Sequence, residues 1–374
     1  MKNVFKKVVT TVVAVAMLAT SALGLASCNG GDDDAIMIGA TGPLTGDAAS
    51  YGISVQNGAM LAVKHLNEKD GLKFNFVMKD DQADPEKARN NYNVLADDGM
   101  QVSLGGVTSG AGEAFAKAAN ADQIFCMTPS GSADPVIKNM KYSFRLCFGD
   151  PDQGVLAAQE IKKTGYTNIG ALYDTSDSYS AGIFAAFEAE MTALGLNNYT
   201  VATFDAENKT DFSTQAEKLK ACDVVFMPFY YTEASLFIDA AVKKGSSAVF
   251  FGCDGFDGIA SYVEDVTNTI MYITPFDVTA TDDQTVAFVN AYKAEYNGAL
   301  PDQFAADAYD VVMVLAAAMA KAGVTDVNID PAELGDLLVS TITAADFSYD
   351  GLTGAMTWDA SGACTKEPNI VTLN

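Results

Sequence analysis

The sequence has a single histidine, His65, among 374 residues, and this scarcity limits the chemistry open to it. A serine triad needs a histidine base, and transition-metal sites are commonly built from histidine or clustered cysteine ligands. His65 falls within a helix-length apolar pattern, which is typical of a structural histidine. No Cys-x-x-Cys pair occurs either. The sequence therefore predicts no catalytic residue, no metal ion and no cofactor.

Basic residues are also few, with 23 Lys and Arg against 48 Asp and Glu and a formal charge of −25. The first 27 residues hold three of the lysines and no acid, so the rest of the chain is more acidic still. A surface of that sign repels nucleic acid and anionic lipid headgroups. We therefore expect no nucleic-acid partner.

The N-terminus combines a basic start with an apolar run. Three lysines precede an apolar stretch at 8–18, which is too short for a stable membrane span, and small residues follow it. This is the pattern of a secretory signal peptide. The stretch LASC (25–28) also matches the bacterial lipobox. We predict a lipoprotein signal peptide at 1–27, cleaved before Cys28, with lipid attached to that thiol; ordinary secretion with an incidental cysteine is the alternative.

The residues after the predicted cleavage site, CNGGDDD (28–34), are glycine-rich and acidic. Such a run cannot pack into a core, so we expect a flexible tether. Further cysteines sit in or beside apolar strand-like runs, where free cysteine acts as a small hydrophobe. These are Cys126, Cys147, Cys222 and Cys253.

Strand-like runs alternate with helix-length segments along the rest of the chain. The expected strands are 35–40, 73–79, 101–106, 123–129, 168–174, 199–204, 223–229 and 248–254. The expected helices include 51–69, 85–98, one from Gly110, 285–301 and 304–323. Repeated β-α units imply parallel sheets covered on both faces. Roughly 340 residues exceed one compact core, so we expect two such lobes.

Small polar residues follow the ends of these strands, where doubly wound sheets bind ligands. One such stretch, GGVTSGAGEAF (105–115), lacks the lysine of a phosphate loop and the third glycine of a dinucleotide fingerprint. A nucleophile elbow would need glycines at the positions of Val107 and Ala111. We expect Ser109 to be the N-cap of the following helix and to bind a small anion such as a ligand carboxylate. A capping role alone is the alternative.

The motif order GATGPLTG, GGVTSG, TPSGSADP, FRLCFGDPDQG, YDTSDSYSAG, PFYYTEASL and GCDGFDG resembles bacterial solute-binding proteins for branched-chain amino acids. This resemblance implies an α/β fold of type I periplasmic binding proteins, with two doubly wound lobes, parallel central sheets and three crossovers. It assigns 35–149 plus 278–345 to lobe one. It assigns 150–277 plus 346–374 to lobe two, with the first crossover at 149–153.

The resemblance also implies a ligand site and the role of each residue in it. Ser109, the Ser130 backbone and the Ser132 hydroxyl would bind the ligand carboxylate. Asp254 would neutralise the ligand ammonium, with Asp257 close enough in sequence to compete. The implied aromatic contacts are Tyr51, Tyr179 and one of Tyr230 and Tyr231.

The expected function is capture of a small, aliphatic amino acid outside the membrane and its delivery to an ABC permease. We expect a lipid-anchored monomer whose lobes close on the ligand by hinge motion. Phe148, Val107 and Phe229 are candidates for the side-chain pocket. The alternatives are another small ligand on the same fold, such as an amide, urea or an aromatic acid, or a ligand-sensing component.

Overall fold

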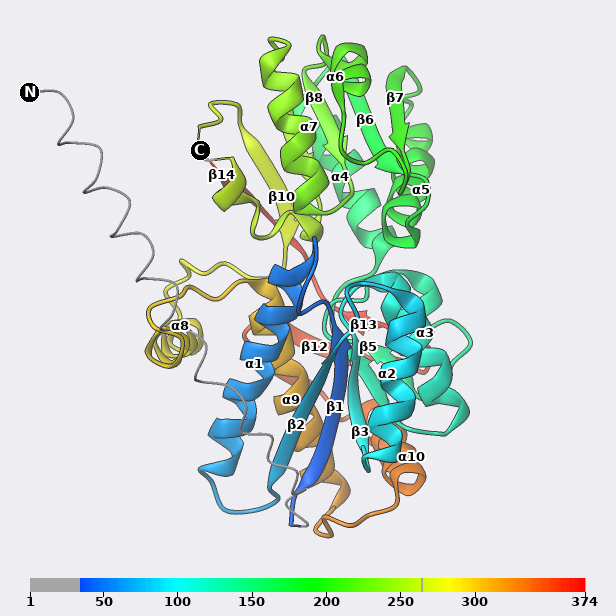
Figure 1. The fold of residues 1–374 in the computed structure, drawn as a ribbon, viewed down its shortest axis with the longest axis vertical. Coiled ribbons are helices and arrows are strands. Elements are labelled where there is room, and N and C mark those ends of the chain that lie inside the picture. The colour runs from blue at the N-terminus through cyan, green and yellow to red at the C-terminus, as the bar shows by residue number, and fades with distance from the viewer. Residues whose placement is uncertain (1–33, 264, 374) are drawn as a thin grey trace, which may run out of the picture.

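The computed structural model describes residues 34–263 and 265–373, which form two α/β lobes stacked end to end (Figure 1). The predicted signal peptide, Cys28 and nearly all of the predicted tether lie outside the described residues. The predicted α/β class with parallel-sheet lobes is confirmed.

Lobe one is built on a five-stranded sheet with the order β2-β1-β3-β4-β5, and every pairing in it is parallel. Its strands are β1 (Ile36–Gly42), β2 (Phe74–Asp80), β3 (Val102–Gly106), β4 (Cys126–Thr128) and β5 (Ser143–Arg145). Its helices are α1 (Ala49–Asn67), α2 (Pro85–Asp97), α3 (Ser109–Ala121), α8 (Asp283–Glu295), α9 (Gln303–Ala322) and α10 (Pro331–Ile342). A short 3-10 helix, η1 (Asp134–Val136), precedes β5.

Lobe two has a six-stranded sheet with the order β14-β10-β9-β8-β6-β7. Its strands are β6 (Ile169–Asp174), β7 (Tyr199–Phe204), β8 (Val224–Met227), β9 (Val249–Gly252), β10 (Ile270–Thr274) and β14 (Asn369–Leu373). Its helices are α4 (Asp150–Thr164), α5 (Ser178–Ala193), α6 (Ser213–Leu219) and α7 (Tyr231–Lys243), followed by the 3-10 helices η2 (Asp254–Phe256) and η3 (Ile259–Tyr262). Strand β14 runs antiparallel to β10, and the other pairs are parallel.

Local sequence signals set several of these elements. The Asp84 carboxylate accepts from the backbone N–H of Lys87 at 2.8 Å, and Pro85 occupies the first turn of α2, as the Asp-Pro pair predicts. Helices α1 and α9 lie against each other because Gly58 has no side chain. A Cβ there would stand 2.0 Å from the Ala305 carbonyl oxygen.

Helix α9 is long and apolar enough to cross a membrane by length and composition alone, but 72% of its most apolar window is buried inside the protein. It packs against α1, α10 and β3 and so forms the core of lobe one. The all-round apolar pattern of this segment therefore reflects burial.

The segment after α10 corrects one predicted boundary. Strands β11 (Tyr349–Gly351), β12 (Gly354–Trp358) and β13 (Cys364–Thr365) form a small separate sheet. The Trp358 indole N–H donates to the Arg145 carbonyl at 2.9 Å, and the Thr353 hydroxyl donates to Asp310 at 2.7 Å. Buried donors of this sheet thus find their acceptors in lobe one. The assignment of all of 346–374 to lobe two is wrong for 349–365, and only β14 joins the second sheet.

A buried ion pair stands where the chain passes from β13 to β14. The Lys366 ammonium donates to the Asp307 carboxylate of α9 at 2.7 Å, and the two side chains are 1% and 3% exposed. Burial raises the pKa of Asp307, although Lys366 opposes this shift. The pair therefore attaches the last crossover to the core helix of lobe one.

We expect Asp307→Asn to lower the free energy of unfolding by roughly 3–5 kcal/mol, because it leaves the Lys366 charge buried without a partner. Urea denaturation followed by circular dichroism measures the change. Asp346→Asn is the matched control, because Asp346 forms an exposed ion pair with Lys321. We expect no measurable change for that control. Equal stability of Asp307→Asn and the wild type would show that the pair contributes nothing.

Candidate functional site

A small cavity lies between the two lobes and is lined by residues from both. Its lining consists of Tyr51, Val107, Thr108, Ser109, Ser130, Tyr179, Tyr230, Asp254, Gly255 and Phe304. Six of the eight predicted ligand-binding residues are therefore brought together. The other two, Ser132 and Tyr231, are buried but do not line this cavity.

Ser109 lies at the rim of lobe one but is not the N-cap of its helix. Helix α3 starts at Ser109 itself, Thr108 holds the N-cap position, and neither hydroxyl caps the helix. The Ser109 hydroxyl instead accepts from the backbone N–H of Ala133 at 3.2 Å, so it ties the β3–α3 loop to the loop after β4. The predicted capping role is wrong because the helix begins one residue earlier than Gly110.

The two serines after β4 differ in their surroundings. The Ser130 hydroxyl donates to the Val107 carbonyl at 2.7 Å, which adds a second link between the two loops. Ser132 is fully buried, and its carbonyl accepts from Arg145 Nη1 at 2.7 Å. The Ser132 hydroxyl has no hydrogen-bond partner within the described chain.

Asp254 supplies a buried carboxylate from lobe two. It starts η2 directly after β9 and is 5% exposed. The Tyr179 hydroxyl donates to its Oδ1 at 2.6 Å. The backbone N–H of Asp254 donates to Gln153 at 3.0 Å, and its carbonyl accepts from Gln303 of lobe one at 2.7 Å. Burial raises the pKa of Asp254 to about 6, although the Tyr179 hydrogen bond opposes that shift.

The Asp257 carboxylate binds the first turn of α9. Its carboxylate accepts from the backbone N–H of Gln303 at the start of α9, at 2.8 Å, and from the N–H of Gly258 at 3.0 Å. It does not line the cavity. Of the two acids in this loop, the cavity is lined by Asp254 alone.

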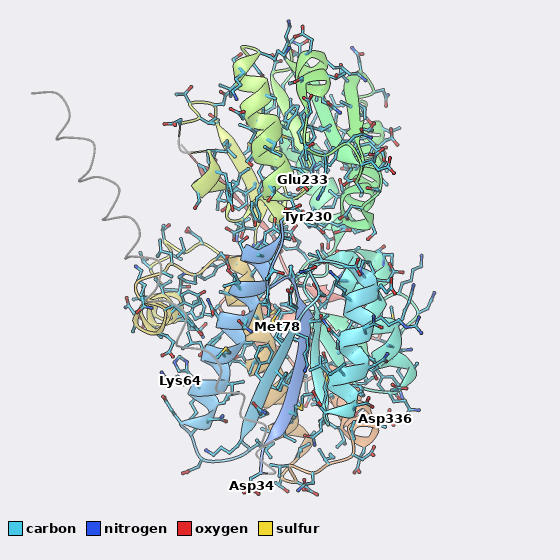
Figure 2. The ribbon with its side chains drawn as sticks, viewed as in Figure 1. Asp34, Lys64, Met78, Tyr230, Glu233 and Asp336 are labelled. Atoms are coloured by element: carbon cyan, nitrogen blue, oxygen red, sulfur yellow. The ribbon has the colours of Figure 1, made fainter. Side chains whose placement is uncertain are left out.

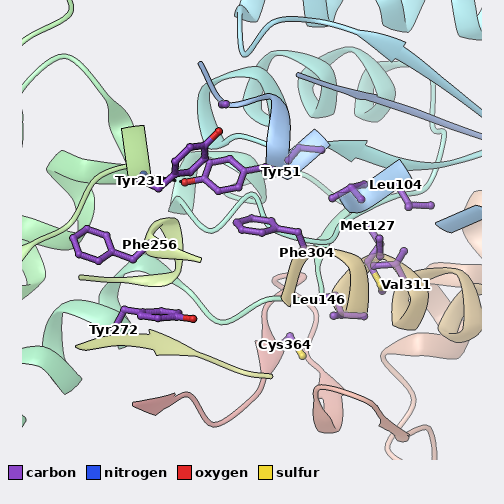
Figure 3. Packing of buried hydrophobic residues seen from close by; sticks show 14 of the residues in the cluster. Tyr51, Leu104, Met127, Leu146, Tyr231, Phe256, Tyr272, Phe304, Val311 and Cys364 are labelled. Carbon is purple, nitrogen blue, oxygen red and sulfur yellow. Dashed lines mark hydrogen bonds between the residues drawn. The ribbon is translucent and has the colours of Figure 1, made fainter. Parts of the chain in front are cut away.

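Tyrosine residues form contacts between the two lobes near the inner cavity. Tyr51 of α1 donates through its hydroxyl to the Gly255 carbonyl and accepts from the N–H of Tyr231 at 3.2 Å. The Tyr51 and Tyr231 rings meet edge to face with their centroids 5.0 Å apart, and Phe304 lies beside Tyr51 (Figure 3). The Tyr230 ring stacks on the Tyr179 ring, and their centroids are 5.1 Å apart. Tyr230 therefore lines the cavity, whereas Tyr231 holds the lobes together.

A larger cavity of about 490 Å³ opens beside the first and shares Thr108, Tyr179 and Tyr230 with it. Lys209 stands on its wall and donates to Asp47 of lobe one at 3.2 Å and to Glu233 of lobe two at 3.0 Å. Tyr230 and Glu233 mark this junction in Figure 2. The ring cluster, by contrast, leaves the inner cavity only about 10 Å³, room for about one water.

The candidate side-chain pocket residues separate in the structure. Val107 lines the inner cavity and Phe229 the larger one. Phe148 is 1% exposed and packs into the core of lobe two. His65 Nδ1 forms a hydrogen bond with the Tyr309 hydroxyl at 2.9 Å. His65 lines neither of these two cavities.

Sequence reasoning missed several lining residues. Thr108 directly precedes Ser109, and Gly255 directly follows Asp254. Their positions in the same motifs could therefore have indicated them. Phe304 offered no such signal, because it begins a core helix that is about 250 residues from Tyr51 in sequence yet adjacent in space.

A family model described as periplasmic binding protein matches residues 35–368. This chain belongs to that family. The match covers every residue that lines the interlobe cavity of this periplasmic binding protein, and all strands and helices of both lobes except β14.

Several relatives of this periplasmic binding protein are known in sequence. A Leu/Ile/Val-binding protein of Rhizobium johnstonii is 28% identical over 296 residues, covering 77% of this chain and 80% of that protein. A leucine-, isoleucine-, valine-, threonine- and alanine-binding protein of Pseudomonas aeruginosa is 26% identical, with 88% and 87% covered.

Solved structures show the same fold. The branched-chain amino acid transporter substrate-binding protein of Streptococcus pneumoniae, in complex with isoleucine, is 28% identical, with a TM-score of 0.80 and coverage of 91% and 96%. A leucine-binding protein of Thermotoga maritima is 24% identical, with a TM-score of 0.80 and coverage of 90% and 94%.

We expect Tyr179→Phe to raise the pKa of Asp254 above its wild-type value of about 6, because the carboxylate loses the hydroxyl that favours its charged form. A carbon NMR titration of the aspartate carboxyl groups measures this. Tyr173→Phe is the matched control, since the Tyr173 ring of β6 stacks on Phe184 and lines neither cavity. An unchanged pKa in Tyr179→Phe would contradict the role of the hydroxyl.

Proposed function

We propose that this protein captures a small aliphatic amino acid outside the cytoplasmic membrane and delivers it to the permease of an ABC importer. One observation carries the proposal. Hydroxyl groups of lobe one face a buried carboxylate of lobe two across a single cavity. Such a site has complementary ends for a zwitterion, and the relatives that bind leucine, isoleucine and valine support it.

The ligand carboxylate would lie against lobe one. Ser109 begins α3, where backbone N–H groups and the helix dipole favour an anion, and Ser130 reaches this point from the loop after β4. Ser132 follows in the same loop as Ser130, and its hydroxyl has no hydrogen-bond partner among the described residues. The ligand ammonium would lie against Asp254, because a buried cation needs a paired anion.

Capture would require the lobes to open and close. The tyrosine rings leave no room for an amino acid in the inner cavity, so Tyr51 of lobe one would move away from Tyr230 of lobe two to admit the ligand. The bonds from Tyr51 to Gly255 and from Tyr231 to Asp47 would then re-form around the ligand. The permease would recognise this closed form.

The protein would act as a monomer that binds and releases its ligand without transforming it. It would be anchored to the outer face of the membrane by lipid on Cys28, with 28–34 as the tether. The lobes would thus stay close to the permease while they open and close freely.

A thermal-shift screen tests the ligand class. Binding raises the melting temperature in proportion to the logarithm of ligand excess over the dissociation constant. The standard amino acids are compared with urea, short amides and aromatic acids. Shifts produced only by ligands that are not amino acids would overturn the zwitterion proposal.

We expect Asp254→Asn to weaken binding of the amino acid by roughly 2–5 kcal/mol, because it keeps the shape of the side chain and removes the anion that faces the ammonium. Titration calorimetry measures the affinity. Asp239→Asn removes an exposed acid from α7 and serves as the control. The wild type should also reject the deaminated analogue. Equal affinities of Asp254→Asn and wild type would place the ammonium elsewhere.

We expect Cys28→Ser to release the protein from membranes without changing ligand affinity, since Cys28 precedes both lobes and all the predicted site residues in the sequence. Cell fractionation and calorimetry measure the two properties. Cys222→Ser, which alters a cysteine within lobe two, is the control and should stay with the membrane. Retention of the Cys28→Ser protein would exclude the lipid anchor.

A further inference from the structure

Unpartnered polar atoms gather near the first crossover, and one of the residues that carry them, Thr108, lines the inner cavity. Nine buried side-chain nitrogen or oxygen atoms of the described residues have no hydrogen-bond partner. Both carboxylate oxygens of Asp150 are among them, together with Ser132 Oγ, Thr108 Oγ1 and Gln153 Nε2. Buried polar groups are nearly always hydrogen-bonded, so this concentration points to partners supplied by a ligand.

Asp150 is held in place by its backbone while its carboxylate is left without a partner. It is the first residue of α4 and 2% exposed, and its N–H donates to the Ser132 carbonyl at 3.1 Å. The carboxylate faces α5 at Gly182, where an added Cβ would stand 3.0 Å from Asp150 Oδ2. The glycine therefore makes room for an acid that the fold itself does not satisfy.

Asp150 forms no ion pair in the described part of the chain. The nearest guanidinium, Arg145, is directed to the Ser132 carbonyl at 2.7 Å and to Asp134 at 3.6 Å. The Ser132 hydroxyl lies beside the carboxylate but makes no hydrogen bond of ordinary geometry with it. The acid is thus buried, uncompensated and adjacent to predicted ligand contacts.

The groups around Asp150 oppose a negative charge on it. Burial raises its pKa well above the ordinary value, and Asp254 and Asp177 raise it further, while Ser132 and Arg145 lower it. Tyr230 and Cys253 also lie within its electrostatic reach. Asp254 already accepts from Tyr179 and is the more readily ionised of the two acids. Two neighbouring buried acids without a cation retain a proton between them.

We propose that Asp150 is a second carboxylate of the ligand site, protonated in the unliganded protein and ionised when the lobes enclose the cationic group of the ligand. This inference rests on the proposed function, because it takes the ammonium of the amino acid as the cation. The ligand then enters with its charge and one proton leaves to solvent. Asp254 and Asp150 share the ammonium from two sides, and Asp150 gains the partner that the fold lacks.

Release of a proton makes affinity depend on pH in a defined direction. Because the liganded protein binds one proton fewer, the association constant rises with pH between the pKa values of Asp150 in the liganded and free protein. The rise approaches tenfold per pH unit for one proton. Asp254, with a pKa of about 6, is already ionised near neutral pH and contributes little there.

Calorimetry of the full chain with the best amino acid from the screen tests this. Titrations at about pH 7.5 in two buffers of different ionisation enthalpy count the protons released. We expect the wild type to release about one proton per ligand bound and Asp150→Asn to release about none, because its amide resembles the protonated acid. The affinity of Asp150→Asn should approach the wild-type value at low pH and fall behind it as the pH rises. Asp239→Asn is the control and should release as many protons as the wild type.

The possible outcomes separate this inference from the proposed function. Binding without proton release in the wild type, or equal release in Asp150→Asn, would overturn the role of Asp150 and leave amino-acid capture intact. Failure of every amino acid to bind the wild type would overturn the proposed function itself. If Asp150→Asn does not fold, the proton count and the pH dependence of the wild type still decide.

Discussion

The buried carboxylate of Asp254 is the constraint around which the junction of the lobes is built. An ionised acid at this depth must be hydrogen-bonded, and its neighbours come from both lobes. Tyr179 donates to the side chain, while Gln153 and Gln303 bind its backbone. Since Gln303 starts the core helix of lobe one, the position of this acid depends on how the lobes meet.

Buried acids at the first and the last crossover differ in how their charge is compensated. At the last crossover, Lys366 and Asp307 are buried together and neutralise each other within the fold. At the first crossover, Asp150 is buried and forms no ion pair with any residue that the structure describes. A structural acid is satisfied by its own chain, whereas an acid left unsatisfied in a cleft is suited to a partner that comes and goes.

Much of the fold could be predicted because the information was local. Strand-like runs at 199–204 and 168–174 correspond closely to β7 and β6, and Asp84-Pro85 starts α2 as its residue types require. The failures concern choices between distant partners. The sheet at 349–365 joins lobe one because buried donors such as the Trp358 indole find acceptors there, and nothing in its short strands indicates which lobe they will meet.

The sequence by itself determined the α/β alternation and the strand-end motifs, because both depend on neighbours in the chain, and the family resemblance of those motifs indicated six of the residues that line the cavity. Only the tertiary structure decided that Tyr230 lines the cavity while Tyr231 joins the lobes, and that Ser109 bonds a second loop instead of capping its helix. Adjacent residues such as these two tyrosines share one sequence motif, yet they point to different surroundings. Packing of segments from opposite ends of the chain, such as Phe304 against Tyr51, sets those surroundings.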